Sequence, residues 1–111
     1  PKYLHAAASG ANTAENVLRF LRESYEACVR HKATSVLLEM RFEGPALDTG
    51  SIYSVIAQRS ETGKQMRKIA YVAQPGREVS KAKFAETVAI NRGVNVRLFP
   101  DVAAARKWLE E

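Results

Sequence analysis

The sequence has few of the residues that would place it in several large classes of protein. It has one cysteine in 111 residues, which excludes an internal disulfide and favours a reducing compartment, the cytoplasm. Its apolar runs are only a few residues long, too short for a transmembrane helix, and no basic-then-apolar leader is visible. With 46% hydrophobic and 26% charged residues, the composition is close to the globular average, so we expect one soluble domain spanning residues 1–111.

The sequence also has few of the residues from which enzymes and metal centres are built. It has two histidines, His5 and His31, and no Ser-His-acid set can be assembled around either. Cys28 and His31 form the closest pair of metal-ligating types, and two residues do not make a metal site. No G-x-G-x-x-G fingerprint follows any expected strand. We therefore expect no metal, no cofactor and no enzymatic activity; a small enzyme, with Pro1 as a secondary-amine catalyst if it is the true terminus, is a minor alternative.

The net charge of +5 is unevenly distributed along the chain. Residues 1–55 carry equal numbers of basic and acidic side chains, so the whole excess lies in residues 56–111. Such a balance permits an acidic partner, which includes nucleic acid, a nucleotide, a phospholipid headgroup or an acidic protein. No run exceeds two like charges, so we read most of these residues as solvated surface and do not expect nucleic-acid binding.

The hydrophobic pattern alternates between the periods of strands and helices. Strands are expected at 3–8, 35–40, 68–73 and 94–99, and helices at 12–32, from 48 to 63 or 67, at 80–92 and from 101 onward. This alternation predicts an α/β domain with a mostly parallel sheet of about four strands flanked by helices. The expected core consists of Leu21, Leu37, Leu38, Ile52, Val72, Phe84, Val88, Val96 and Leu98.

Local signals mark the ends of these helices. Asn12 is the expected N-cap of the first helix, with Glu15 completing a capping box. Gly93 should stop the third helix, and Asp101 should cap the last. The inward face of the first helix is expected to contain Val17, Leu18, Leu21, Tyr25, Cys28 and Val29.

The start of the second helix is the first candidate site. Asp48 or Thr49 is expected to cap this helix, with Gly50 and Ser51 in its first turn. A phosphate added to the hydroxyl of Thr49 or Ser51 would lie near free backbone amides and the positive end of the helix dipole. The segment is therefore either a simple cap or a phosphorylatable switch loop.

The start of the third helix is the second candidate site. Arg77, Ser80 and Lys81 lie where the third strand ends and this helix begins, and basic residues in a first turn oppose the helix dipole. We expect them to bind an anion at the free amides of the turn. The alternative is that Glu78 offsets Arg77 and the lysines point into solvent.

This layout resembles the STAS domains, which include the bacterial anti-sigma-factor antagonists. The resemblance rests on Val36-Leu37-Leu38-Glu39 in the central strand, Asp48-Thr49-Gly50-Ser51 in the switch loop and Trp108-Leu109 in the closing helix. The family typically has Asp-Ser-Ser-Gly, whose first Ser a partner kinase phosphorylates. Thr49 takes that place here, and Gly50 and Ser51 stand in swapped order. The resemblance implies a non-enzymatic module that binds a protein partner under the control of phosphate or nucleotide.

One alternative function belongs to a different class. A small-ligand carrier that binds an anion, such as a nucleotide or a lipid headgroup, would also suit a basic α/β domain of this size. Such a carrier should respond to anionic ligands in a thermal shift, whereas a partner module should not. The sequence leaves the oligomeric state open.

Overall fold

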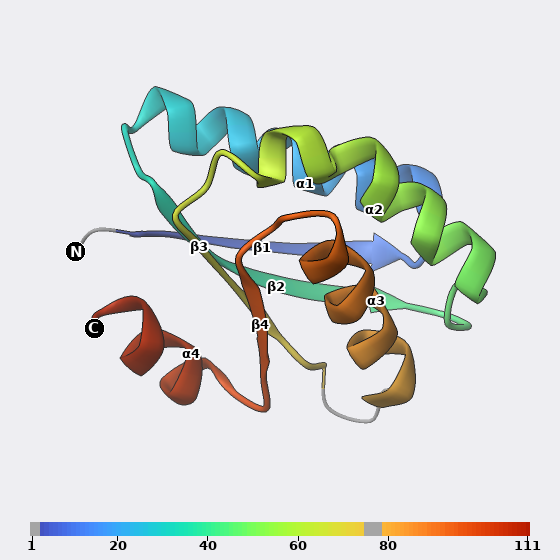
Figure 1. Ribbon diagram of the computed structural model, residues 1–111. Helices are drawn as coiled ribbons and strands as arrows, with labels where there is room; N and C mark the ends of the chain where they lie inside the picture. The colour runs from blue at the N-terminus through green and yellow to red at the C-terminus, as the bar shows by residue number, and fades with distance from the viewer. Residues whose placement is uncertain (1–2, 75–78) are drawn as a thin grey trace.

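The computed structural model describes residues 3–74 and 79–111, in which four strands alternate with four helices (Figure 1). The elements are β1 (Tyr3–Ala11), α1 (Ala14–Arg30), β2 (Ser35–Glu43), α2 (Thr49–Gly63), β3 (Lys68–Val72), α3 (Val79–Asn91), β4 (Val96–Phe99) and α4 (Val102–Leu109). The expected β-α order is confirmed. Within the described ranges, no helix is both long and apolar enough to cross a bilayer.

The sheet runs in the order β1-β2-β3-β4, and each of these pairs is parallel. The predicted parallel α/β architecture is therefore confirmed. Because the crossovers between neighbouring parallel strands share one hand, α1, α2 and α3 lie on the same face. Helix α4 follows the last strand and packs against the opposite face, where it contacts β2, β3 and β4 (Figure 1).

Two hydrophobic clusters lie on either side of the sheet. Neighbouring residues of β2 point to opposite faces, so Leu38 enters the larger cluster beneath α1–α3, whereas Leu37 enters the smaller cluster beneath α4. The segment 35–38 is buried throughout because helices cover both faces of the sheet there. This explains its continuous apolar run.

The predicted cap of the first helix is wrong by one residue. The hydroxyl of Thr13 accepts a hydrogen bond from Asn16 N at 3.1 Å, so Thr13 is the N-cap of α1. Asn12 instead continues the strand pairing: its backbone N donates to Glu43 O at 2.8 Å, and its Nδ2 donates to Pro45 O at 2.9 Å. Because Asn12 extends the β1–β2 ladder, the helix begins later than expected.

Three other local predictions have clear outcomes. Helix α2 ends at Gly63 rather than running on to 67, and Asp101 caps α4 by accepting from Ala104 N at 2.8 Å, as predicted. Val29 was expected to face inward, but it is 60% exposed. Cys28 occupies the inward position of that turn, and consecutive helical residues are about 100° apart, which turns Val29 towards solvent.

The predicted core is correct in part. Leu37, Leu38, Val72 and Val88 are buried, whereas Leu21, Ile52, Phe84, Val96 and Leu98 are only half-buried. Leu21, Ile52 and Val96 line an open cavity, which accounts for their accessible surface.

Candidate functional site

The first candidate site is the loop that leads into α2. Asp48 is the N-cap of this helix, and its Oδ1 accepts a hydrogen bond from Ser51 N at 2.7 Å. The backbone amide of Ser51, then its hydroxyl and the charge of Lys81, hold the pKa of Asp48 below its usual value. Asp48 therefore remains a carboxylate at neutral pH and presents a fixed negative charge at the helix start.

The two hydroxyls of this loop have different surroundings. Thr49 is exposed at the first position of α2. Ser51 is half-buried, and its hydroxyl lies close enough to Asp48 to lower the pKa of that carboxyl. Of the two predicted phosphoacceptors, Thr49 is thus the more accessible.

Lys81 connects the second candidate site to the first. From the first turn of α3, its Nζ donates to the carbonyl oxygen of Leu47 at 3.3 Å, and its charge lies near Asp48. The structure therefore brings Lys81 and the Asp48 loop together, although the sequence placed them in separate sites. This contact also gives Lys81 a partner that compensates for its position against the helix dipole.

The expected anion site has two further members, Ser80 and Arg77. Ser80 is exposed at the start of α3. Arg77 lies outside the described residues, so its part in an anion site stays a prediction.

Two exposed apolar residues flank the loop. Tyr53 lies one helical turn after Thr49, and Val79 begins α3. We define the switch-loop surface as Asp48, Thr49, Tyr53, Val79 and Lys81. This surface combines the exposed hydroxyl of Thr49, two apolar side chains and the opposite charges of Asp48 and Lys81. The sequence analysis did not single out Tyr53 and Val79. Both are apolar residues that lie off the inward face of their helix, and this position could have indicated that they are exposed.

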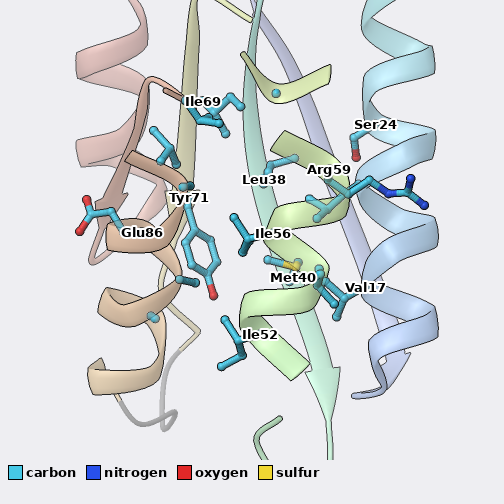
Figure 2. A pocket seen from close by; sticks show the side chains of 18 of the residues that line it. Val17, Ser24, Leu38, Met40, Ile52, Ile56, Arg59, Ile69, Tyr71 and Glu86 are labelled. Carbon is cyan, nitrogen blue, oxygen red and sulfur yellow. The ribbon is translucent and has the colours of Figure 1, made fainter. Parts of the chain in front are cut away.

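An apolar cavity lies between the sheet and the helices on the α1–α3 face (Figure 2). Its volume is about 230 Å³, and it is partly open to solvent. Leu38 and Met40 of β2, Ile52 and Ile56 of α2, and the ring of Tyr71 from β3 project into it. The feature of the sequence that could have indicated this cavity is a row of small residues on α3, which leaves space above the sheet. These residues are Ala82, Ala85 and Ala89.

Two charged side chains in the cavity wall have partners outside the cavity. Arg59 Nε donates to Leu18 O of α1 at 3.1 Å, and its guanidinium points towards that helix (Figure 2). Glu86 Oε2 accepts from Leu98 N at 2.7 Å. With these groups occupied elsewhere, the cavity is suited to apolar rather than charged contents.

Comparison with known proteins identifies the family. The sequence model of the family described as SpoIIAA-like matches residues 3–110. The chain belongs to the SpoIIAA-like family. The expected resemblance to STAS domains is thereby confirmed, and at the level of the family it supports a regulatory or protein-interaction module. No curated protein and no solved structure matches the chain.

The SpoIIAA-like chain also carries a small charged cluster on the α4 side of its sheet. His5 Nε2 lies 2.5 Å from Glu39 Oε1, and Arg41 Nη2 lies 3.1 Å from the same oxygen. Burial acts to raise the pKa of Glu39, but hydrogen bonds from His5 and Arg41 outweigh it and lower the pKa. His5, for which the sequence showed no partner, is thus paired with Glu39 across neighbouring strands.

Neither the cysteine nor the metal-ligating side chains described in the SpoIIAA-like chain form a reactive site. Cys28 is buried in α1, and desolvation raises the pKa of its thiol, which makes it a poor nucleophile. Among residues 3–74 and 79–111, no group of three or more His, Cys, Asp or Glu side chains is placed to hold a metal ion.

Proposed function

We propose that this SpoIIAA-like protein is a non-enzymatic regulatory module that binds a protein partner through the switch-loop surface. The observation that carries the proposal is the exposure of Thr49 at the start of a helix capped by Asp48, with Lys81 of α3 beside the loop. Tyr53 and Val79 add exposed apolar area of the kind that protein interfaces bury.

We further propose that phosphorylation of Thr49 controls this binding. A phosphate adds a charge of about −1.5 to −2, which the positive end of the α2 dipole and the ammonium of Lys81 would stabilise. The same phosphate would stand beside the carboxylate of Asp48, whose lowered pKa keeps it ionised. The modification would therefore change an almost neutral surface into a strongly negative one.

Replacing Thr49 with Asp is expected to change the affinity for the partner by about tenfold, the size of one hydrogen bond to a charged group. Proteins retained from a cell lysate by immobilised wild type and T49D would be quantified by mass spectrometry. Thr87 is an exposed threonine on α3, so T87D is a matched control that should retain the wild-type set.

The same experiment distinguishes docking from regulation. Tyr53→Ala should weaken retention of the same protein, because Tyr53 lies in the proposed interface. Identical retention by wild type, T49D, T49A and Y53A would contradict the proposal. Loss of retention in Y53A without any effect at Thr49 would keep the interface and remove the phosphate control.

A second candidate function, a small-ligand carrier, is supported by the cavity. Its apolar lining disfavours a nucleotide and favours an amphiphile, with an aliphatic chain in the cavity and an anionic headgroup near Lys81 in its wall. The volume of about 230 Å³ lies below the usual range for drug-sized ligands, so one short chain is the appropriate occupant.

Filling the cavity tests this candidate. With decanoate as the probe, a carrier should show a rise in Tm that Ala85→Phe reduces strongly, because Ala85 lines the cavity. Ala103 is exposed on α4, so Ala103→Phe should respond like wild type. Equal responses from all three proteins, or none from wild type, would reject the carrier function while leaving the partner module untouched.

A further inference from the structure

The three loops that precede β2, β3 and β4 lie together at one end of the sheet. Because the strands are parallel, all of them begin at this end, which we call the amino edge. Arg67 N donates to Thr34 O at 2.7 Å, and Asn95 Nδ2 donates to Arg67 O at 2.7 Å, so each loop is bonded to the next. The side chain of Lys64 also lies against Gly93. Residues that are distant in sequence thus form one continuous surface.

The amino edge gathers basic side chains from three parts of the chain. Residues 30–34, 64–68 and 91–95 contain six Lys or Arg side chains and no Asp or Glu. Lys68 turns to the α4 side, where its Nζ donates to Trp108 O, and the other five are exposed. We define the amino-edge surface by these five residues, which are Arg30, Lys32, Lys64, Arg67 and Arg92.

The positive charge of this surface is only slightly neutralised by its surroundings. Among the described ion pairs, the one that involves it joins Lys64 to Glu61 at 3.1 Å, and Glu61 is itself exposed. The negative ends of three helix dipoles lie at this edge, which explains how the fold tolerates so much like charge there. The segments that follow β1, β2 and β3 hold four acids and three bases, in residues 10–15, 43–51 and 73–83. The protein therefore has one basic end and one nearly neutral end.

Exposed aliphatic side chains border the amino-edge surface. Val29 directly precedes Arg30 in the last turn of α1 and is 60% exposed. Ile90 lies two residues before Arg92 in α3 and is 51% exposed. A nucleic acid would bind the basic side chains and leave both aliphatic side chains in water. An anionic lipid bilayer accepts both, because its headgroups attract Lys and Arg and its acyl boundary takes up aliphatic groups.

We propose that the amino-edge surface binds an anionic lipid bilayer. Its five basic side chains lie among the headgroups, and Val29 reaches the acyl boundary. The switch-loop surface lies at the opposite edge of the sheet, where α2 and α3 begin, so the bound protein presents it to solvent. The two surfaces share no residue, so this inference does not depend on the proposed binding of a protein partner.

Sedimentation with lipid vesicles tests the proposal. Wild type should bind vesicles of about 70% phosphatidylcholine and about 30% phosphatidylglycerol, less at high salt, and should not bind pure phosphatidylcholine. The double variant Lys64→Gln, Arg67→Gln should lower the partition coefficient by about 25-fold, or about fivefold for each charge. The control variant Arg22→Gln, Lys83→Gln removes two exposed charges elsewhere on α1 and α3, and should lower it by less than about threefold.

Val29 distinguishes a bilayer from another polyanion. Val29→Ser should lower vesicle binding by about fivefold, because it removes the aliphatic group at the acyl boundary. Binding to a DNA duplex of about 20 base pairs but not to the anionic vesicles would assign a nucleic acid and overturn the proposal. Equal binding to both kinds of vesicle, no binding to either, or equal losses in the two double variants would also overturn it. Thermal melting of each variant verifies that the fold is retained.

A fluorescent label reports which end of the protein faces the bilayer. Cys28 is buried, so the label is attached selectively at Asn91→Cys, on the amino edge, or at Thr49→Cys, in the switch loop. Lipids that carry a nitroxide in the headgroup should quench the label at residue 91 more strongly than the label at residue 49. Equal or reversed quenching would place another face on the bilayer and overturn the proposal.

Discussion

Replacing Leu38 with alanine is expected to lower the free energy of unfolding by about 2–5 kcal/mol. Leu38 is 7% exposed, lies on β2 between two paired strands, and packs in the larger hydrophobic cluster. Its side chain also lines the existing cavity, so the vacated space would join a void that the surrounding helices already fail to close. Urea-induced unfolding, followed by circular dichroism, measures the loss.

Ile90 provides the matched control for this change. It is an aliphatic residue of the same size on α3, but it is 51% exposed, so Ile90→Ala should change the free energy of unfolding by no more than about 0.5 kcal/mol. A loss at Leu38 as small as that at Ile90 would mean that β2 does not lie in the centre of the core.

Replacing Trp108 with alanine is expected to cost about 3 kcal/mol, the lower end of the range for large aromatic residues, because Trp108 is partly exposed. Its ring packs against Phe99 at a centroid distance of 5.5 Å. Lys68 Nζ and Arg97 Cζ lie 5.0 Å and 5.3 Å from the same ring. The indole thus fixes α4 to two strands, and its loss should release the helix from the face that it covers.

Lys107 lies beside Trp108 on the exposed side of α4 and serves as the control. Lys107→Ala should leave both the unfolding transition and the exchange of the α4 amides almost unchanged. Trp108→Ala should speed exchange in α4 more than in β2, because α4 detaches before the sheet unfolds. Equal stability of the two variants would show that the indole contributes little to the attachment of α4.

The local sequence was sufficient to predict the order and type of the elements. The apolar segment 36–38 identifies a buried strand, and Asp101 caps a helix with a side chain that needs only its own neighbours. The choice between Asn12 and Thr13 could not be made in this way. Both residues can cap a helix, and the choice is decided by the pairing of Asn12 with Glu43, which is distant in sequence.

The candidate site was predictable only where its contacts are local. Asp48 and Ser51 lie within one turn, so their hydrogen bond follows from the sequence pattern. The bond from Lys81 to Leu47 depends on how α3 packs beside the start of α2, which no local pattern reports. The cavity could not be predicted for a similar reason. Leu21 and Ile52 are apolar, so the sequence pattern places them in the core, and only the packing of the helices shows that the space beside them is unfilled.

The unbroken strand order from β1 to β4 has a consequence for the way the chain acquires its structure during translation. Each of β2, β3 and β4 pairs with the strand made just before it, so its partner is already in place when it is synthesised. None of the four described strands must insert between two that have already paired, and each pairing closes a loop only one helix long. One face of the sheet is not covered in this stepwise manner. The apolar side chains on the face that contains Leu37 stay exposed to chaperones and to other nascent chains until α4, which covers them, leaves the ribosome.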